Sequence, residues 1–190
     1  MPDYPNFKET EKILLANVKD SYQIHHSYTV SKVMEKYSHI LKETFPMSTD
    51  NFEPERWAVC GLIHDWDYGF DPEGHPQKNI NSLRDYGYPK DILDAILGHA
   101  LFLKEARTTK MAQALLAIDE TVGLLFAYSK MKGGYQNMEV KGVLKKFKDK
   151  SFAAKINRND ILTGVNELGI TMDQHITNIL LILKSDSSLP

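Results

Sequence analysis

The sequence lacks the features that would direct it to a membrane, to the cell exterior or onto nucleic acid. Its single cysteine, Cys60, cannot form an internal disulfide, which favours a reducing cytosol. Its longest aliphatic runs, such as ILLIL at 179–183, are far shorter than the roughly 20 residues of a membrane span. The segment MPDYPNFKET has no basic stretch followed by an apolar one, as a secretory signal would. A net charge of −2 argues against a protein that coats nucleic acid. We therefore expect a cytoplasmic protein with neither a membrane nor a nucleic-acid polymer as partner.

Strand patterns are also scarce, and helical periodicity dominates the chain. Between residues 21 and 45, apolar side chains recur every three or four positions, and Pro54 is suited to the first turn of a helix that runs to about residue 63. Similar patterns predict helices over 76–87, 89–103, 110–131 and 171–184, with a loop at 132–137. We predict an all-α fold in a single domain over 1–190: a helical bundle over about 20–131 and a C-terminal helical extension over 138–185.

Helical phase separates the histidines into inward-facing and outward-facing positions. His26 lies on the same face as Val30 and Val33, whereas His25 and His39 face water. The other polar residues that fall on apolar faces are His64, His99 and Asp119. His175 lies on a mixed face that is compatible with exposure.

A single inward-facing histidine is more often an ordinary core residue than a ligand. Here three of them accompany Asp119, His75 just before Pro76, and Asp65 next to His64. Six polar groups buried without a common purpose would destabilise the core. A metal centre would give them a purpose, because neutral imidazoles and carboxylates are standard metal ligands.

The order of these residues resembles the HD superfamily of metal-dependent phosphohydrolases. HSYTVSKVMEKYS, from His26, is similar to the first metal helix of that family, GLIHDWDYGF to its His-Asp turn, and LLAIDETVGL to the helix with its last aspartate. The segment from His75 to His99 resembles an insert of the binuclear branch, and the similarity spans 22–127. The segment VLKKFKDKSFAAKINRNDI resembles the ending of an uncharacterised bacterial subfamily of predicted HD hydrolases.

The resemblance implies an HD-type helical bundle that binds two divalent transition-metal ions, drawn from Fe, Mn, Co, Ni and Zn. Asp65 would bridge the ions and be the catalytic carboxylate; the remaining metal ligands would be His26, His64 and Asp119 at one site and His75 and His99 at the other. A metal-activated hydroxide would then attack a small phosphate ester, for example a nucleotide. We expect Cys60 to serve packing and not catalysis.

The sequence departs from the family pattern directly after the His-Asp pair. Many binuclear relatives have a lysine there that is thought to bind substrate phosphate, whereas this chain has Trp66, Asp67 and Tyr68. We expect Lys78 and Arg107 to supply the missing cations. Trp66 and Tyr68 either stack on a base of the substrate, with Trp66 as the candidate binding residue, or serve to pack the loop. The segment 141–158 holds seven lysines and arginines against one acid, and is either a solvated face or a basic cover over the site.

Three alternatives use the same residues. The first is a mixed-valent di-iron oxygenase of the HD type, and the second is a non-catalytic nucleotide-binding module. In the third, the site is mononuclear and comprises His26, His64, Asp65 and Asp119, with His75 and His99 in other roles. The sequence leaves the oligomeric state open.

Overall fold

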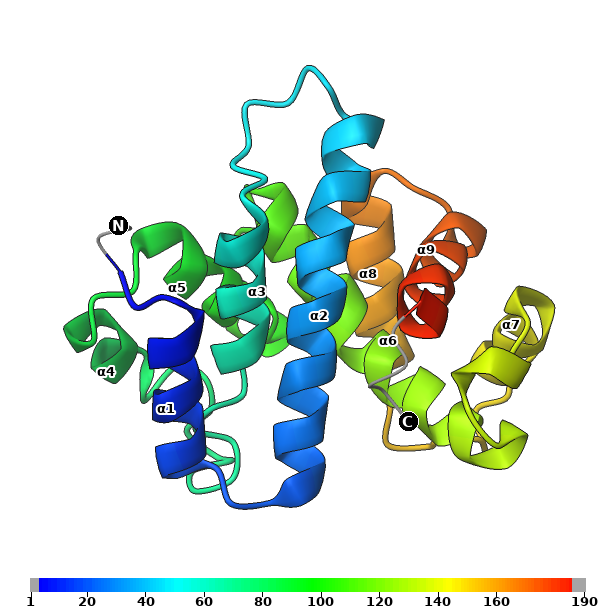
Figure 1. Ribbon diagram of the computed structural model, residues 1–190, viewed down its shortest axis with the longest axis horizontal. Coiled ribbons are helices and arrows are strands. Elements are labelled where there is room, and N and C mark those ends of the chain that lie inside the picture. Colours follow the sequence, from blue (N-terminus) through cyan, green and yellow to red (C-terminus); the bar gives the residue numbers. More distant parts are fainter. Residues whose placement is uncertain (1–3, 186–190) are drawn as a thin grey trace.

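The computed structural model, which describes residues 4–185, has a helix in each region where the sequence predicts one, although the helix expected over 89–103 is divided, with a break at residues 99–100 (Figure 1). This part of the chain contains no β-strand, and the predicted all-α class is confirmed. The α-helices are α1 (Phe7–Asn17), α2 (Ser21–Thr44), α3 (Pro54–Ile63), α4 (Ile80–Asp85), α5 (Lys90–Gly98), α6 (Lys110–Lys132), α7 (Val140–Lys148), α8 (Arg158–Leu168) and α9 (Met172–Ser185). Two short 3-10 helices are η1 (Leu101–Leu103) and η2 (Tyr135–Asn137).

Side-chain caps fix several helix starts where the sequence predicts them. The Asp20 carboxylate accepts a hydrogen bond from the backbone of Gln23 at the start of α2, and the Thr109 hydroxyl accepts one from Ala112 at the start of α6. The helix expected from residue 76 is shorter than predicted. Residues 76–79 form turns, and α4 begins only at Ile80.

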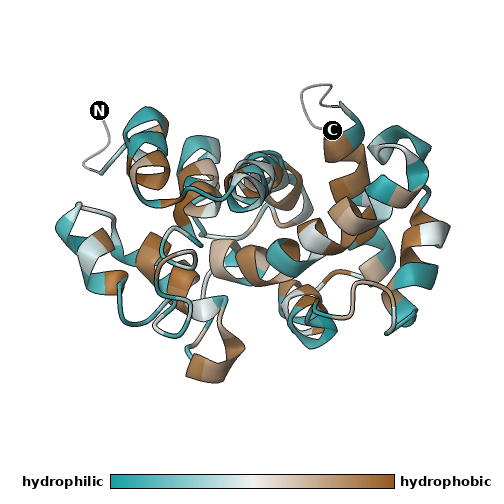
Figure 2. Ribbon diagram, turned by 90° about the horizontal axis from the view of Figure 1, so that it is seen from below, coloured by the Kyte–Doolittle hydropathy of each residue, from teal (hydrophilic) through white to brown (hydrophobic). Residues whose placement is uncertain are grey.

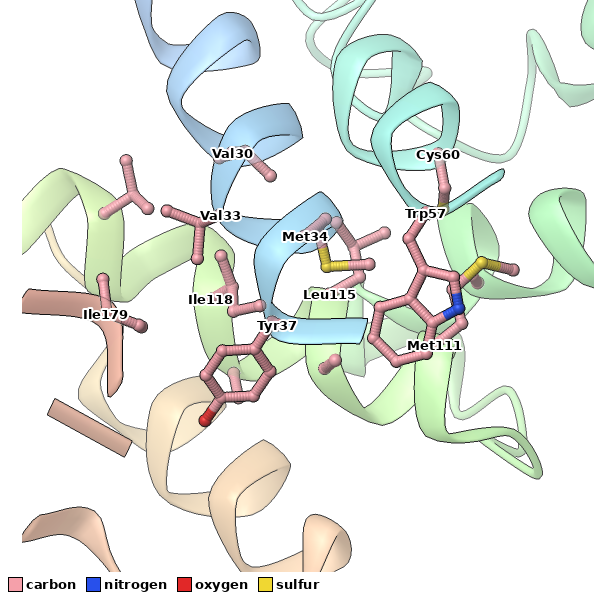
Figure 3. Close-up of a cluster of buried hydrophobic side chains, with 14 of the residues drawn as sticks. Val30, Val33, Met34, Tyr37, Trp57, Cys60, Met111, Leu115, Ile118 and Ile179 are labelled. Atoms are coloured by element: carbon pink, nitrogen blue, oxygen red, sulfur yellow. The ribbon is translucent and has the colours of Figure 1, made fainter. Parts of the chain in front are cut away.

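The core lies where α2 packs between α3, α6 and α9. Figure 3 shows Val33 and Tyr37 of α2 among side chains of these neighbours, including Trp57, Ile118 and Ile179. Figure 2 shows the corresponding hydropathy pattern, in which most of the apolar residues lie on the sides of the helices that face one another and most of the hydrophilic residues lie on their outer sides.

Close approach of α2 and α3 requires a glycine. A Cβ on Gly61 would lie 2.9 Å from the Cα of Ser31, so any side chain at position 61 would push the two helices apart. This approach brings the end of α3, which carries the His-Asp pair, against the first half of α2.

The central helix α6 is long and apolar enough, by length and composition alone, to cross a membrane. However, 72% of its most apolar window is buried inside the protein, which is typical of the core helix of a bundle. α8 packs closely on it, since a Cβ on Gly164 would lie 2.6 Å from the backbone nitrogen of Ala117. The C-terminal helices thus share one hydrophobic core with the bundle, to which they contribute Ile161, Val165 and Ile179.

Candidate metal centre

Six side chains from five parts of the chain meet in two adjoining groups. His26 comes from α2, His64 and Asp65 from the end of α3, His75 from the following turns, His99 from the end of α5, and Asp119 from the middle of α6. They form two groups, His26 with His64, Asp65 and Asp119, and Asp65 with His75 and His99. In each group the possible ligand atoms lie within 4.8 Å of one another, so each group could hold a metal ion. The structure therefore brings together all six residues selected by helical phase and resemblance.

Asp65 belongs to both groups because its two carboxylate oxygens face in different directions. Oδ2 lies 3.4 Å from Nε2 of His64 and 4.0 Å from Nε2 of His26. Oδ1 lies 3.2 Å from Nε2 of His75 and 3.6 Å from Nε2 of His99. One carboxylate thus serves two clusters of imidazoles, one with each oxygen.

Three of the histidines are oriented by hydrogen bonds from Nδ1. His64 Nδ1 donates to the Gly61 carbonyl at 2.8 Å, and His99 Nδ1 donates to the Ile96 carbonyl. Both carbonyls lie in the last turn of a helix, where they lack an intrahelical donor. His75 Nδ1 donates to the Asp67 carboxylate at 2.6 Å. In each ring, the proton on Nδ1 leaves the Nε2 lone pair pointing into the site, which is the usual arrangement of a metal-binding histidine.

The arrangement of these nitrogens fits a cation better than it fits a closed hydrogen-bond network. Nε2 of His64 is buried and has no hydrogen-bond partner. Nε2 of His75 lies 3.1 Å from Nε2 of His99, although both rings already use Nδ1 as a donor. Two lone pairs at this distance repel each other unless a proton or a metal ion lies beside them. The donor set of imidazoles and carboxylates is one that transition metals prefer.

The charges of the site shift its pKa values in opposite directions. Burial lowers the pKa of His64, but the carboxylates of Asp65 and Asp119 outweigh burial and raise it well above its ordinary value. Burial likewise lowers the pKa of His75, and Asp65 and Asp67 raise it to about 9. For Asp65 burial raises the pKa, but His64 and its other imidazole neighbours hold it well below its usual range. Protons and metal ions therefore compete for the same nitrogens, and metal affinity is expected to fall on acidification.

Asp67 supports the site without belonging to either group. Its side chain is almost fully buried and accepts hydrogen bonds from His75 Nδ1 and from Asn79 Nδ2, the latter at 3.1 Å. The sequence pattern did not indicate this role. The available signal was a second aspartate two residues after the His-Asp pair.

Five of the six residues, all except the fully buried His64, line a cavity of about 950 Å³, which is large enough for a small organic ligand. Tyr22 stacks on His26, with ring centroids 6.4 Å apart, and Tyr68 meets His75 edge to face at 5.4 Å. Both tyrosine side chains are about half exposed, so the cavity has aromatic walls beside each histidine cluster. Glu120 also lines the cavity, and burial together with the charge of Asp119 raises its pKa to about 7.

The structure does not bring the three predicted substrate-binding residues to the cavity wall. Lys78 is 71% exposed and forms an ion pair with Asp71 at 2.9 Å. Arg107 makes two hydrogen bonds of 2.7 Å with the Glu167 carboxylate and a third with the Gly98 carbonyl. Trp66 is only 6% exposed and packs edge to face on Phe70, so its ring is not available for stacking on a base.

Two residues outside the centre also have defined environments. Cys60 is fully buried in the core, in line with a packing role, and burial raises the pKa of its thiol. His175, whose position was compatible with exposure, is instead fully buried. Its Nδ1 pairs with the Tyr37 hydroxyl at 2.7 Å, and its Nε2 lies 3.1 Å from the Ala117 carbonyl. His175 is therefore a core histidine with hydrogen-bond partners on both ring nitrogens, although it lies on a helical face of mixed polarity.

Comparison of the chain with models of known protein families, with curated proteins and with solved structures gave no match. The resemblance to the HD superfamily therefore stays a prediction from the motifs, and function is inferred from the geometry of the centre.

Proposed function

We propose that this protein is a metal-dependent phosphohydrolase that binds two divalent transition-metal ions and hydrolyses a small phosphate ester, for example a nucleotide. The ions would be drawn from Fe, Mn, Co, Ni and Zn, as the imidazole-rich ligand set favours. His26, His64 and Asp119 would hold one ion, His75 and His99 the other, and Asp65 both.

The observation that carries the proposal is the position of the Asp65 carboxylate. Each of its oxygens faces a separate cluster of histidine nitrogens, at 3.4 Å from His64 on one side and 3.2 Å from His75 on the other. A carboxylate placed in this way is suited to bridge two ions. A single-ion site would need only one of these oxygens and would leave the other cluster unused.

When bound, a pair of divalent ions supplies Lewis-acid activation of water and neutralises charge that develops on a phosphoryl group. The residues of the chain supply orientation. Asp67 holds His75 in the tautomer whose Nε2 is free, and the backbone carbonyls of Gly61 and Ile96 do the same for His64 and His99. The cavity, walled by Tyr22 and Tyr68, can enclose a compound of nucleotide size.

Metal content and phosphate release test this proposal together. The protein is purified without chelator, its metal is quantified per chain, and phosphate release from a panel of nucleotides and simple monoesters is followed with each metal, with and without oxygen. We expect two ions per chain and oxygen-independent phosphate release. Asp65→Ala should remove both metal and activity, whereas Asp94→Ala, which removes an exposed carboxylate paired with Lys90, should change neither.

The other outcomes separate the alternatives. One ion per chain would contradict the binuclear site and support the mononuclear one. Oxygen consumption with a half-reduced di-iron EPR signal, and no phosphate release, would favour the oxygenase. Tight nucleotide binding without turnover under any metal would favour a binding module. Unchanged metal content in Asp65→Ala would refute the bridging role.

A further inference from the structure

The loop over residues 149–157, between α7 and α8, forms one wall of the cavity. Lys155, Ile156 and Asn157 line the same cavity as Asp65 and His75. The loop belongs to the basic segment for which the sequence left two interpretations, a solvated face or a cover over the site. The contacts of the loop determine which of its positively charged side chains lines the cavity.

The guanidinium group of Arg158 holds this loop in place through hydrogen bonds to backbone carbonyls. Its Nε donates to the Phe147 carbonyl at 2.8 Å, and its Nη2 donates to the Asp149 carbonyl at 3.0 Å. The guanidinium also donates to the carbonyls of Phe152, Ala153 and Ile156. Because an arginine side chain has five N–H donors in a fixed plane, this one residue fixes the path of the whole loop. The backbone of Ala153 has φ of +44°, a conformation that a non-glycine residue adopts only where its surroundings enforce it.

Two further contacts hold the loop against α6. Ile156 packs on Gly123, where an added Cβ would lie 2.9 Å from the Ile156 Cδ1 atom, so the tip of the Ile156 side chain lies directly against α6. The backbone of Asn157 faces the Glu120 carboxylate closely enough to lower the pKa of that carboxyl against the effect of burial. Both α6 residues line the cavity, and the loop is therefore positioned directly beside the candidate metal centre.

Lys155 is the positively charged residue of this loop that lines the cavity. Within residues 4–185, no other lysine or arginine lines the cavity, whose remaining charged groups include the five carboxylates of Asp20, Asp65, Asp119, Glu120 and Asp160. Its side chain is exposed, and in the described part of the chain it forms no ion pair. Lys78 and Arg107, by contrast, are already paired with carboxylates away from the cavity wall.

We propose that Lys155 binds the phosphate of the substrate. The loop, held in place by the hydrogen bonds of Arg158, positions the Lys155 ammonium group at the cavity for this role. This inference rests on the proposed function and deepens it. A phosphate that enters a cavity rich in carboxylates needs a cation besides the metal ions, and an ammonium with no carboxylate partner can bind a phosphoryl oxygen without first breaking an ion pair. Lys155 thus takes the role that the missing lysine after the His-Asp pair has in relatives.

Binding of inorganic phosphate tests this role without requiring turnover. The full-length protein, reconstituted with Mn(II), is titrated with inorganic phosphate by calorimetry, as wild type and as Lys155→Met. We expect the substitution to raise the dissociation constant about tenfold, the usual effect of losing one charge-assisted hydrogen bond. Lys155→Arg should restore most of the affinity. Lys150→Met is the matched control, since Lys150 is an exposed lysine of the same loop that lies outside the cavity wall, and its effect should stay within about twofold because charges away from the site are screened.

Equal phosphate affinities of wild type and Lys155→Met would overturn the proposal, as would equal losses in Lys150→Met and Lys155→Met. Failure of the wild type to bind phosphate at millimolar concentrations would also overturn it. Metal content is measured on the same samples and distinguishes a lost cation from a lost metal ion. Lys155-dependent phosphate binding in a protein that hydrolyses no ester would support the binding role and contradict the proposed hydrolase activity alone.

Discussion

Two buried histidines on opposite sides of α6 have opposite hydrogen-bonding states. His64 and His175 are both fully buried. His175 has partners on both ring nitrogens, Tyr37 on Nδ1 and the Ala117 carbonyl with the Thr121 hydroxyl on Nε2. His64 has a partner only on Nδ1, and its Nε2 points at two carboxylates without forming a hydrogen bond.

The contrast shows that burial does not by itself distinguish a ligand from a core residue. The charges around each ring differ as well. Carboxylates raise the pKa of His64, whereas burial lowers the pKa of His175 to about 4. A histidine kept neutral with both nitrogens satisfied serves the packing of α2, α6 and α9. A histidine with an unused nitrogen beside two carboxylates is available to a metal ion.

The largest effect on activity is expected from removing the His64 side chain, whose Nε2 has no hydrogen-bond partner. His64→Ala should lower phosphate release by about 10³-fold or more, because a lost ligand disturbs the ions on which charge stabilisation depends. Metal content per chain and kcat/KM measure the effect, and circular dichroism checks that the helices remain.

His175→Ala is the matched control for that variant and should show the reverse pattern. It leaves a cavity and unpaired groups around Tyr37, and should lower the free energy of unfolding by about 2–4 kcal/mol while metal content stays normal. Loss of metal from His175→Ala with unchanged stability would contradict the division of roles between the two histidines.

Acid should destabilise the protein through His175. Its pKa is about 4 in the folded protein and near 6.5 when unfolded, so the unfolded state binds more protons between these values. Stability should therefore fall as the pH drops from about 6.5 to about 4, by about 3 kcal/mol in total from this group. Denaturant unfolding of wild type and His175→Asn across this range measures the effect as the difference between the two proteins, since the groups of the metal centre titrate in both. A constant difference would show that His175 does not titrate on unfolding.

A smaller effect is expected from the residue that orients His75. Asp67→Asn removes the carboxylate that accepts the His75 Nδ1 proton, and should weaken metal binding at the group of Asp65, His75 and His99 by about 10–100-fold. Competition with a chelating indicator measures both sites in one titration. Uniform weakening of both ions would contradict the view that Asp67 acts through His75 alone.

Local sequence patterns predicted the framework of the site because they depend on nearby residues only. Helical phase placed His26, His64, His99 and Asp119 on inward faces, and in the structure all four reach the same centre. The start of the helix at Lys110 and the first-turn position of Pro54 were also predictable from local sequence. Turn geometry was less predictable, as the late start of α4 at Ile80 shows.

The partners of polar side chains were not predictable in the same way, because they come from distant parts of the chain. Arg107 pairs with a carboxylate 60 residues away, and Tyr37 with an imidazole 138 residues away. Proximity in sequence to a predicted ligand made Lys78, Arg107 and Trp66 attractive substrate-binding candidates. Each has other contacts, however, and Lys155 lines the cavity instead.

The sequence by itself determined the all-α class and the inward direction of the four residues placed by helical phase, since a period of 3.6 residues is a property of each helix alone. Only the tertiary structure decided that Asp65 faces two clusters, that Asp67 orients His75, and that the loop stapled by Arg158 brings Lys155 to the cavity. The physical reason is that hydrogen bonds and ion pairs need their two atoms within about 3–4 Å, and only the packing of helices on one another sets such distances between remote residues.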